Sequence, residues 1–225
     1  MKNTRYSLRA LARLIAYPDA QLRSELDALL QVLDDEAAVP APRRAELRAL
    51  AADLLRQDPL AVEARYVETF DRGRSTSLHL FEHVHGDSRD RGPAMIDLAR
   101  TYEQAGLFLA PDELPDHLGV VLEFASTQPP QIARAFLGEM AHILNAVFSA
   151  LLKRESPYAV VIAAVLELAG QRVQAVPVAA EEPLDESWAE PEAWGGCSTR
   201  GQSRPGEAQP VHIVRPARSA ERAAA

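Results

Sequence analysis

The spacing of the apolar residues constrains the fold of this chain more than any other feature. Apolar side chains recur every three or four residues up to about residue 172, and no convincing stretch alternates apolar with polar residues. The first spacing puts apolar side chains on one face of a helix, whereas alternation is typical of a strand. One such stripe consists of Leu22, Leu26, Leu29 and Leu33. The sequence therefore predicts an all-α fold, a single-domain helical bundle over residues 1–172.

Prolines and one glycine indicate where the predicted helices begin and end. Proline suits the first turn of a helix, because the amides there have no partner within the helix. We expect helix starts near Pro18, Pro42, Pro59, Pro93 and Pro157. A helix over 93–105 should stop at Gly106, and a longer one should span 131–154. The segment 158–166 is apolar on most faces, which predicts a helix in the middle of the bundle.

The last part of the chain, residues 173–225, is rich in Pro, Glu, Ala, Gly and Ser. Such a composition cannot bury enough apolar area to offset the entropy that is lost on ordering. We therefore predict a low-complexity, mostly disordered C-terminal tail. The role of Trp188, Trp194 and Cys197 within it stays open.

Charge and cysteine content exclude several classes of partner and compartment. The chain has 24 Lys and Arg against 32 Asp and Glu, a formal net charge of −8, which disfavours binding to nucleic acid or to anionic lipid. A single cysteine cannot form an internal disulfide, as suits a reducing compartment. No signal-like start and no apolar run of about 18 residues is present. We expect a cytoplasmic protein without membrane insertion.

Two E-x-x-H pairs are the strongest argument for an enzyme. Glu82 with His85 and Glu139 with His142 have the spacing that carboxylate-bridged di-iron helical bundles use on each of two helices. A two-residue pattern arises readily by chance in a helical chain rich in glutamate. The motifs of zinc peptidases, phosphate loops and dinucleotide sites are all missing from the sequence. We therefore predict no catalytic residues and no bound metal, with a di-iron enzyme as the alternative.

An unusual group of polar residues surrounds Pro115. Glu113, Asp116 and His117 gather where a helix entry is expected, ahead of the apolar residue Leu118. Acids near a helix N-terminus are stabilised by the helix dipole, so a purely structural role is one interpretation of this group. A binding role is the other, and both stay open at this point.

Two stretches resemble the redox-enzyme maturation chaperones of the TorD/DmsD/NarJ group. Residues 66–92, YVETFDRGRSTSLHLFEHVHGDSRDRG, look like the signature of the branch that assembles nitrate reductase. Residues 113–118, ELPDHL, with Glu123 and Phe124, resemble the E-x-P-x-H motif of the wider family. The similarity extends over about residues 5–170. The signature residues carried over from the first stretch are His79, Phe81, Glu82, His83, His85, Arg89, Asp90 and Arg91.

The resemblance implies a bundle of the TorD/NarJ type and a function without catalysis. Such a protein is a system-specific chaperone that binds the N-terminal segment of the respiratory nitrate reductase catalytic (α) subunit. It keeps that subunit competent for molybdenum cofactor insertion before membrane assembly, and no cofactor is expected to stay bound to the chaperone. Proteins of molybdenum cofactor biosynthesis are a further expected partner.

A negatively charged helical bundle can offer an apolar groove rimmed by acids, which suits a basic amphipathic helix. The candidate peptide-binding residues are Tyr66 and Phe70 as groove aromatics, Glu113, Asp116 and Glu123 as rim acids, and Pro115, His117 and Leu118 from the motif. Periodicity alone would place the two aromatics in the core, which is the alternative for them. We expect the histidines of the first stretch to make hydrogen bonds or to pack at a helix end or rim rather than to hold metal.

Overall fold

The computed structural model describes residues 3–72, 74–86, 88–111 and 113–177, and within this part of the chain all regular elements are helical. Trp188, Trp194, Cys197 and nearly all of the predicted tail lie outside the described residues. The elements in chain order are α1 (Arg5–Leu14), α2 (Ala20–Glu36), α3 (Ala41–Arg56), α4 (Pro59–Phe70), the 3-10 turn η1 (Arg74–Thr76), α5 (Glu82–His85), α6 (Arg91–Gln104), α7 (Leu118–Thr127), α8 (Pro130–Glu139), α9 (Ala141–Lys153) and α10 (Ala159–Leu168). The all-α prediction is confirmed.

Local sequence signals explain several of the helix ends. Pro59 is the first residue of α4, and the side chain of Asp58 accepts a hydrogen bond from the Ala61 amide, which satisfies one of the unpaired first-turn donors. α6 ends at Gln104, followed by Gly106 at φ +80°, a left-handed conformation that glycine adopts without steric cost. The predicted stop at Gly106 is thus confirmed.

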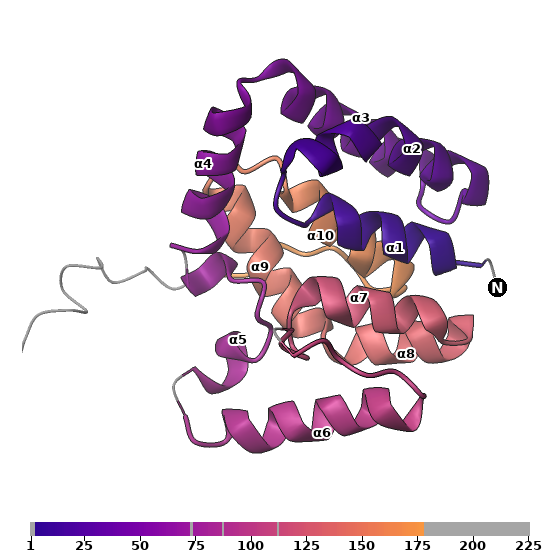
Figure 1. The fold of residues 1–225 in the computed structure, drawn as a ribbon, viewed down its shortest axis with the longest axis vertical. Helices are drawn as coiled ribbons and strands as arrows, with labels where there is room; N and C mark the ends of the chain where they lie inside the picture. Colours follow the sequence, from indigo (N-terminus) through magenta and orange to yellow (C-terminus); the bar gives the residue numbers. More distant parts are fainter. Residues whose placement is uncertain (1–2, 73, 87, 112, 178–225) are drawn as a thin grey trace, which may run out of the picture. The chain divides into compact units, whose positions relative to one another are not determined.

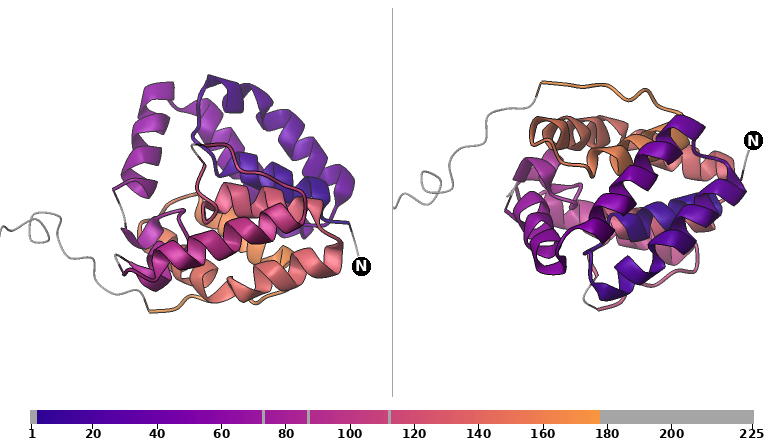
Figure 2. Two further views of the ribbon diagram at one scale, coloured as in Figure 1. Left: turned by 60° about the horizontal axis from the view of Figure 1, so that its bottom comes forward. Right: turned by 90° about the horizontal axis from the view of Figure 1, so that it is seen from above.

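The core is built around α1 and α10. α1 packs against α2, α7 and α10, and it lies between α2 and α7 in Figure 1. All of residues 159–166 in α10 are buried, as the apolar composition on every face of this segment predicted. α5 and α6 lie at the lower edge of the view in Figure 1 and come forward in the left view of Figure 2. The segment between α4 and α7 is therefore an addition at one edge of the bundle.

The long helix predicted over 131–154 is wrong, because two helices, α8 and α9, meet there at a bend of 65°. The Met140 amide donates to the Leu137 carbonyl, a tighter turn than an α-helix makes, just after Gly138, which is a weak helix former. In α8 the buried residues are Ala133 and Leu137, whereas Ile132 is exposed. No single described helix is both long and apolar enough to cross a membrane, and α8 with α9 meets those criteria only as this bent pair.

An extended segment follows α10 and lies along α9. Asn145 donates to the Arg172 carbonyl and accepts from the Gln174 amide, and Ser149 accepts from the Val176 amide. These bonds satisfy backbone groups that a solvated tail would leave to water. The hydrogen-bonded chain therefore continues a few residues past the boundary expected at residue 172.

Candidate functional site

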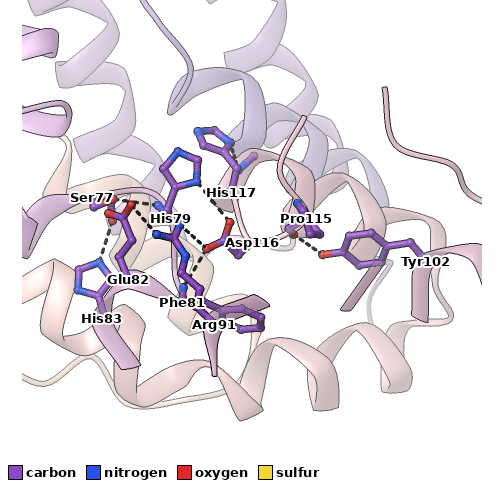
Figure 3. Close-up of polar contacts among 11 residues, drawn as sticks. Ser77, His79, Phe81, Glu82, His83, Arg91, Tyr102, Pro115, Asp116 and His117 are labelled. Atoms are coloured by element: carbon purple, nitrogen blue, oxygen red, sulfur yellow. Dashed lines mark hydrogen bonds and ion pairs between the residues drawn. The ribbon is translucent and has the colours of Figure 1, made fainter. Parts of the chain in front are cut away.

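The two stretches that carry the family resemblance meet in space, although residues 93–112 separate them in the chain. His79 and His117 form an isolated antiparallel bridge. On either side of it, the Leu80 amide donates to the Asp116 carbonyl at 3.0 Å and the Leu118 amide donates to the Leu78 carbonyl at 2.8 Å. This short pairing fixes the segment before α5 against the segment before α7. It creates the polar cluster shown in Figure 3.

Asp116 is the centre of this cluster and is fully buried. Its Oδ1 lies 3.3 Å from Nδ1 of His79, and its Oδ2 accepts from the Phe81 amide at 3.2 Å. The guanidinium of Arg91 lies 3.5 Å from the same Oδ2 and also pairs with Glu82 at 3.2 Å. A buried carboxylate is tolerated only when hydrogen bonds and opposite charge replace its lost hydration. Here α5, α6 and the bridge together provide them.

Titration of the cluster follows from these contacts. Burial alone would raise the pKa of Asp116, but the hydrogen bonds from His79 and Phe81 and the charge of Arg91 lower it on balance. The hydrogen bond to Asp116 raises the pKa of His79 against the effect of burial. Burial lowers the pKa of His117, and the charge of His79 lowers it further. The ring centroids of these two histidines are 5.2 Å apart. The cluster thus favours a negative Asp116 beside a protonated His79.

A second contact ties α6 to the same place. The hydroxyl of the buried Tyr102 donates to the Pro115 carbonyl at 2.8 Å, and its ring packs on Phe124 of α7 with centroids 4.5 Å apart. Pro115, in the middle of the E-x-P-x-H stretch, and Phe124 therefore both contact Tyr102 of α6, and Figure 3 shows the hydrogen bond between Tyr102 and Pro115. Pro115 is buried, and its backbone carbonyl accepts this hydrogen bond.

The predicted rim of three acids is only partly formed. Glu113 and Glu123 are exposed, but Asp116 is buried, so its prediction as a rim acid is wrong. The helix entry also differs from expectation, because α7 starts at Leu118 and the His117 side chain, not Asp116, accepts from a first-turn amide. The Asp116 carboxylate instead turns toward His79, where a positive partner offsets the cost of burial.

Tyr66 and Phe70 lie in the core, which corrects their prediction as groove aromatics. Their side chains are 7% and 5% exposed, and the Tyr66 hydroxyl donates to the Ile15 carbonyl. Both rings meet Tyr158, with centroids 5.7 and 5.2 Å apart. Leu118 is also fully buried. Aromatic side chains are most stable when they pack against other rings away from water, and Tyr158, just before α10, provides such a partner on the inner side of α4.

The remaining signature residues make local contacts. His83 lies 2.9 Å from the Ser77 carbonyl, and the His85 ring packs edge-on against Phe81. Arg89 and Asp90 are exposed just before α6, where the Asp90 amide donates to the Ser88 hydroxyl. The hydrogen bonds and ring contact of His79, His83 and His85 agree with the prediction for these histidines.

The described part of the chain contains no set of ligands for the di-iron centre that is the alternative interpretation. Glu82 is paired with Arg91, while Glu139 and His142 are exposed beside the bend between α8 and α9. No group of three or more His, Cys, Asp or Glu side chains among the described residues is placed to hold a metal ion. A di-iron centre of this type needs two histidines and four carboxylates that converge on one point.

One surface was missed by the sequence analysis. A pocket on the outer side of α4 is lined by Tyr17, Leu60, Glu63, Ala64, Val67, Glu68 and Arg72, and we call these seven residues the α4 groove. The available signal was a second apolar stripe on α4, because Leu60, Ala64 and Val67 recur at helical spacing on a face distinct from that of Val62, Tyr66 and Phe70.

The His79 contact predicts a particular dependence of stability on pH. A raised folded pKa means that the stabilisation by His79 is present below its unfolded value of 6.5 and is lost as pH rises through the folded pKa. The lowered pKa of His117 acts oppositely and costs stability as pH falls below 6.5. We expect His79→Gln to destabilise by about 1 kcal/mol or less near pH 6, since the side chain is one-third exposed, and by less above the folded pKa.

Urea denaturation of the wild type and His79→Gln at a series of pH values measures this difference. His117→Gln is the matched control, because it should change the pH dependence in the opposite direction. Two parallel stability curves for the wild type and His79→Gln would show that protonation of His79 contributes nothing to stability.

Comparisons with known proteins place the chain in a family. Residues 36–164 match the model of the nitrate reductase delta subunit family. Over 177 residues the chain is 43% identical to the nitrate reductase molybdenum cofactor assembly chaperone NarJ of Escherichia coli. The aligned region covers 79% of this chain and 75% of NarJ. The chain is also 38% identical over 153 residues to the nitrate reductase-like protein NarX of Mycobacterium tuberculosis, covering 68% of this chain and 22% of NarX.

A solved structure shares the fold. The crystal structure of a protein described as a redox enzyme maturation protein from Archaeoglobus fulgidus superposes with a TM-score of 0.53 at 20% sequence identity, covering 76% of this chain and 96% of the other. That likeness shows the fold alone. The family assignment rests on the sequence matches, which span both stretches of the polar cluster. The chain therefore belongs to the nitrate reductase delta subunit family.

Proposed function

We propose that this chain is a chaperone that binds the N-terminal segment of the nitrate reductase catalytic subunit and keeps that subunit competent for molybdenum cofactor insertion. The observation that carries the proposal is the 43% identity to E. coli NarJ over 79% of the chain. The family is one of chaperones and not of catalysts, so the chain catalyses no reaction. Its action in the cytoplasm, before membrane assembly, and contact with proteins of cofactor biosynthesis belong to the same proposal.

The polar cluster supports this proposal as a structural frame rather than as a reactive centre. Each polar atom that Asp116 presents is engaged by His79, Phe81 or Arg91, so no group is left poised for proton transfer to a substrate. The cluster holds α5 and α6 in place beside α7. A protein whose role is to present a surface needs such fixed elements.

The negative charge of the chain supports the proposal that the client segment it binds is basic. The formal net charge is −8, and Glu113 and Glu123 remain exposed acids that a Lys or Arg side chain can reach. An acidic surface raises the local concentration of a basic peptide and orients it on approach. The apolar face of an amphipathic helix then requires an exposed apolar surface, which Tyr66, Phe70 and Leu118 do not provide.

Binding of a client peptide should be salt-dependent. We expect a synthetic peptide of the first ~15–40 residues of the catalytic subunit to bind with micromolar or tighter affinity, a length that one or two helices can present to a groove. Raising NaCl from about 0.05 to 0.5 M should weaken binding roughly tenfold, since several surface ion pairs are screened at once. Isothermal titration calorimetry measures both values.

The control is a peptide of the same composition in scrambled order, which keeps the charge but loses the apolar face. It should bind at least tenfold more weakly than the native order. Absence of binding by the native peptide at micromolar concentrations would refute the proposed function. Equal binding by both peptides would show that the interaction is only a nonspecific attraction of charge.

A further inference from the structure

The outer face of α4 is an unpartnered apolar surface. α4 uses Val62, Tyr66 and Phe70 for the core and turns Leu60, Ala64 and Val67 into the α4 groove, a pocket of about 370 Å³. No labelled helix lies on the side of α4 that faces away from α9 and α10 (Figure 1). The helix is therefore apolar on two sides, although the described chain covers only one of them.

The apolar residues of the groove are exposed together rather than singly. Leu60 is 74% exposed and Tyr17, which reaches the groove from the segment after α1, is 43% exposed. Isolated apolar side chains are common on protein surfaces, but several that line one hollow mark a binding surface. Ala64 lies one turn from Leu60 and nearly one turn from Val67. Its short side chain leaves a notch that a larger side chain of a partner helix can fill.

The groove also carries an acid without a cationic partner. The Tyr17 hydroxyl donates to Glu63 at 3.0 Å, and no Lys or Arg among the described residues lies within salt-bridge distance of that carboxylate. The second acid, Glu68, is paired with Arg72 at 3.1 Å. A carboxylate at the edge of an apolar surface gains most from a Lys or Arg brought by a ligand, because the contact is partly shielded from water.

We propose that the α4 groove binds the apolar face of a basic amphipathic helix, with a Lys or Arg of that helix paired to Glu63. This site rests on the proposed function, because the helix is the client segment named there. The helix lies against α4 and inserts one apolar side chain over Ala64, between Leu60 and Val67. Charge complementarity at Glu63 selects a basic helix over an acidic one.

Single substitutions in the groove test the site without affecting the fold. Leu60→Asp should weaken binding of the client peptide at least tenfold, since it places a charge where an apolar side chain docks. Glu63→Lys should weaken binding about tenfold at low salt and less at high salt, and Glu63→Gln should weaken it less than Glu63→Lys. Circular dichroism and the melting temperature should stay unchanged, because exposed positions tolerate such changes.

The matched control is Ile132→Asp on α8. Ile132 is 54% exposed and undergoes the same change of size and charge on another helix, so binding should stay within twofold of the wild type. Amide NMR shifts on peptide addition should concentrate on residues 60–68. The measurements use the full chain and the synthetic peptide.

Each other outcome identifies which proposal fails. A wild type that binds the peptide, with groove variants that bind equally well, overturns the α4 site and leaves the proposed function standing. A loss confined to Glu123→Lys would place the site on α7 instead. A wild type that dimerises in sedimentation, and a Leu60→Asp variant that does not, would assign the groove to a second copy of this chain. A wild type that binds no peptide overturns both proposals.

Discussion

Asp116→Ala is expected to lower the free energy of unfolding by about 3–5 kcal/mol, the range for breaking a buried ion pair by removing one partner. Asp116 is fully buried, and the substitution leaves the Phe81 amide without an acceptor and Arg91 without its inner carboxylate. Asp116→Lys is expected to be worse, because it buries a positive charge beside His79 and Arg91. Such a variant tests stability rather than binding.

Urea denaturation followed by circular dichroism measures the effect. The control is Glu123→Ala, which removes an exposed carboxylate from α7 and should change the free energy of unfolding by about 0.5 kcal/mol or less. An Asp116→Ala variant as stable as this control would mean that the cluster does not hold the two stretches together. In that case the contact between the segments before α5 and α7 would depend on their backbone bridge alone.

Phe70→Ala is expected to destabilise the fold by about 3–5 kcal/mol, as large-to-small substitutions of buried aromatics do. The Phe70 ring is 5% exposed, and its centroid lies 4.7 Å from that of Tyr66 and 5.2 Å from that of Tyr158. Removing it leaves a cavity between α4 and the start of α10 and breaks two ring contacts.

The matched control for Phe70 lies on a different face of the same helix. Leu60→Ala should change stability by about 0.5 kcal/mol or less, because Leu60 is 74% exposed. Thermal or urea unfolding compares the two variants directly. A Phe70→Ala variant that unfolds like the wild type but no longer binds the client peptide would return this aromatic to the binding surface and refute its place in the core.

The sequence determined the helical class and several of the helix boundaries, because these depend on local physics. The three-to-four residue apolar period requires helices whatever their partners are. Pro59 starts α4 and Gly106 follows the end of α6 because each supplies a backbone property that a helix end needs. The uniformly apolar segment at 159–166 had to be buried, since no amphipathic surface position suits it.

Sequence patterns could not decide which side of a helix meets which neighbour. α4 has two apolar faces, and only the packing of Tyr66 and Phe70 on Tyr158 shows that one is core and the other is groove. The bend between α8 and α9 also depends on tertiary packing, which buries Ala133 and Leu137 and leaves Ile132 exposed.

The position of Asp116 shows the same division most clearly. Its neighbours in the chain made it a plausible helix-entry or rim acid, because the residue type and local sequence suit both. Its burial depends on His79, Phe81 and Arg91, which come from a distant stretch and are brought to it by the bridge between residues 79 and 117. The sequence by itself thus determined the helices and the presence of two family stretches. Only the tertiary structure decided that these stretches join at a buried carboxylate, because the partners that make its burial favourable are assembled by folding.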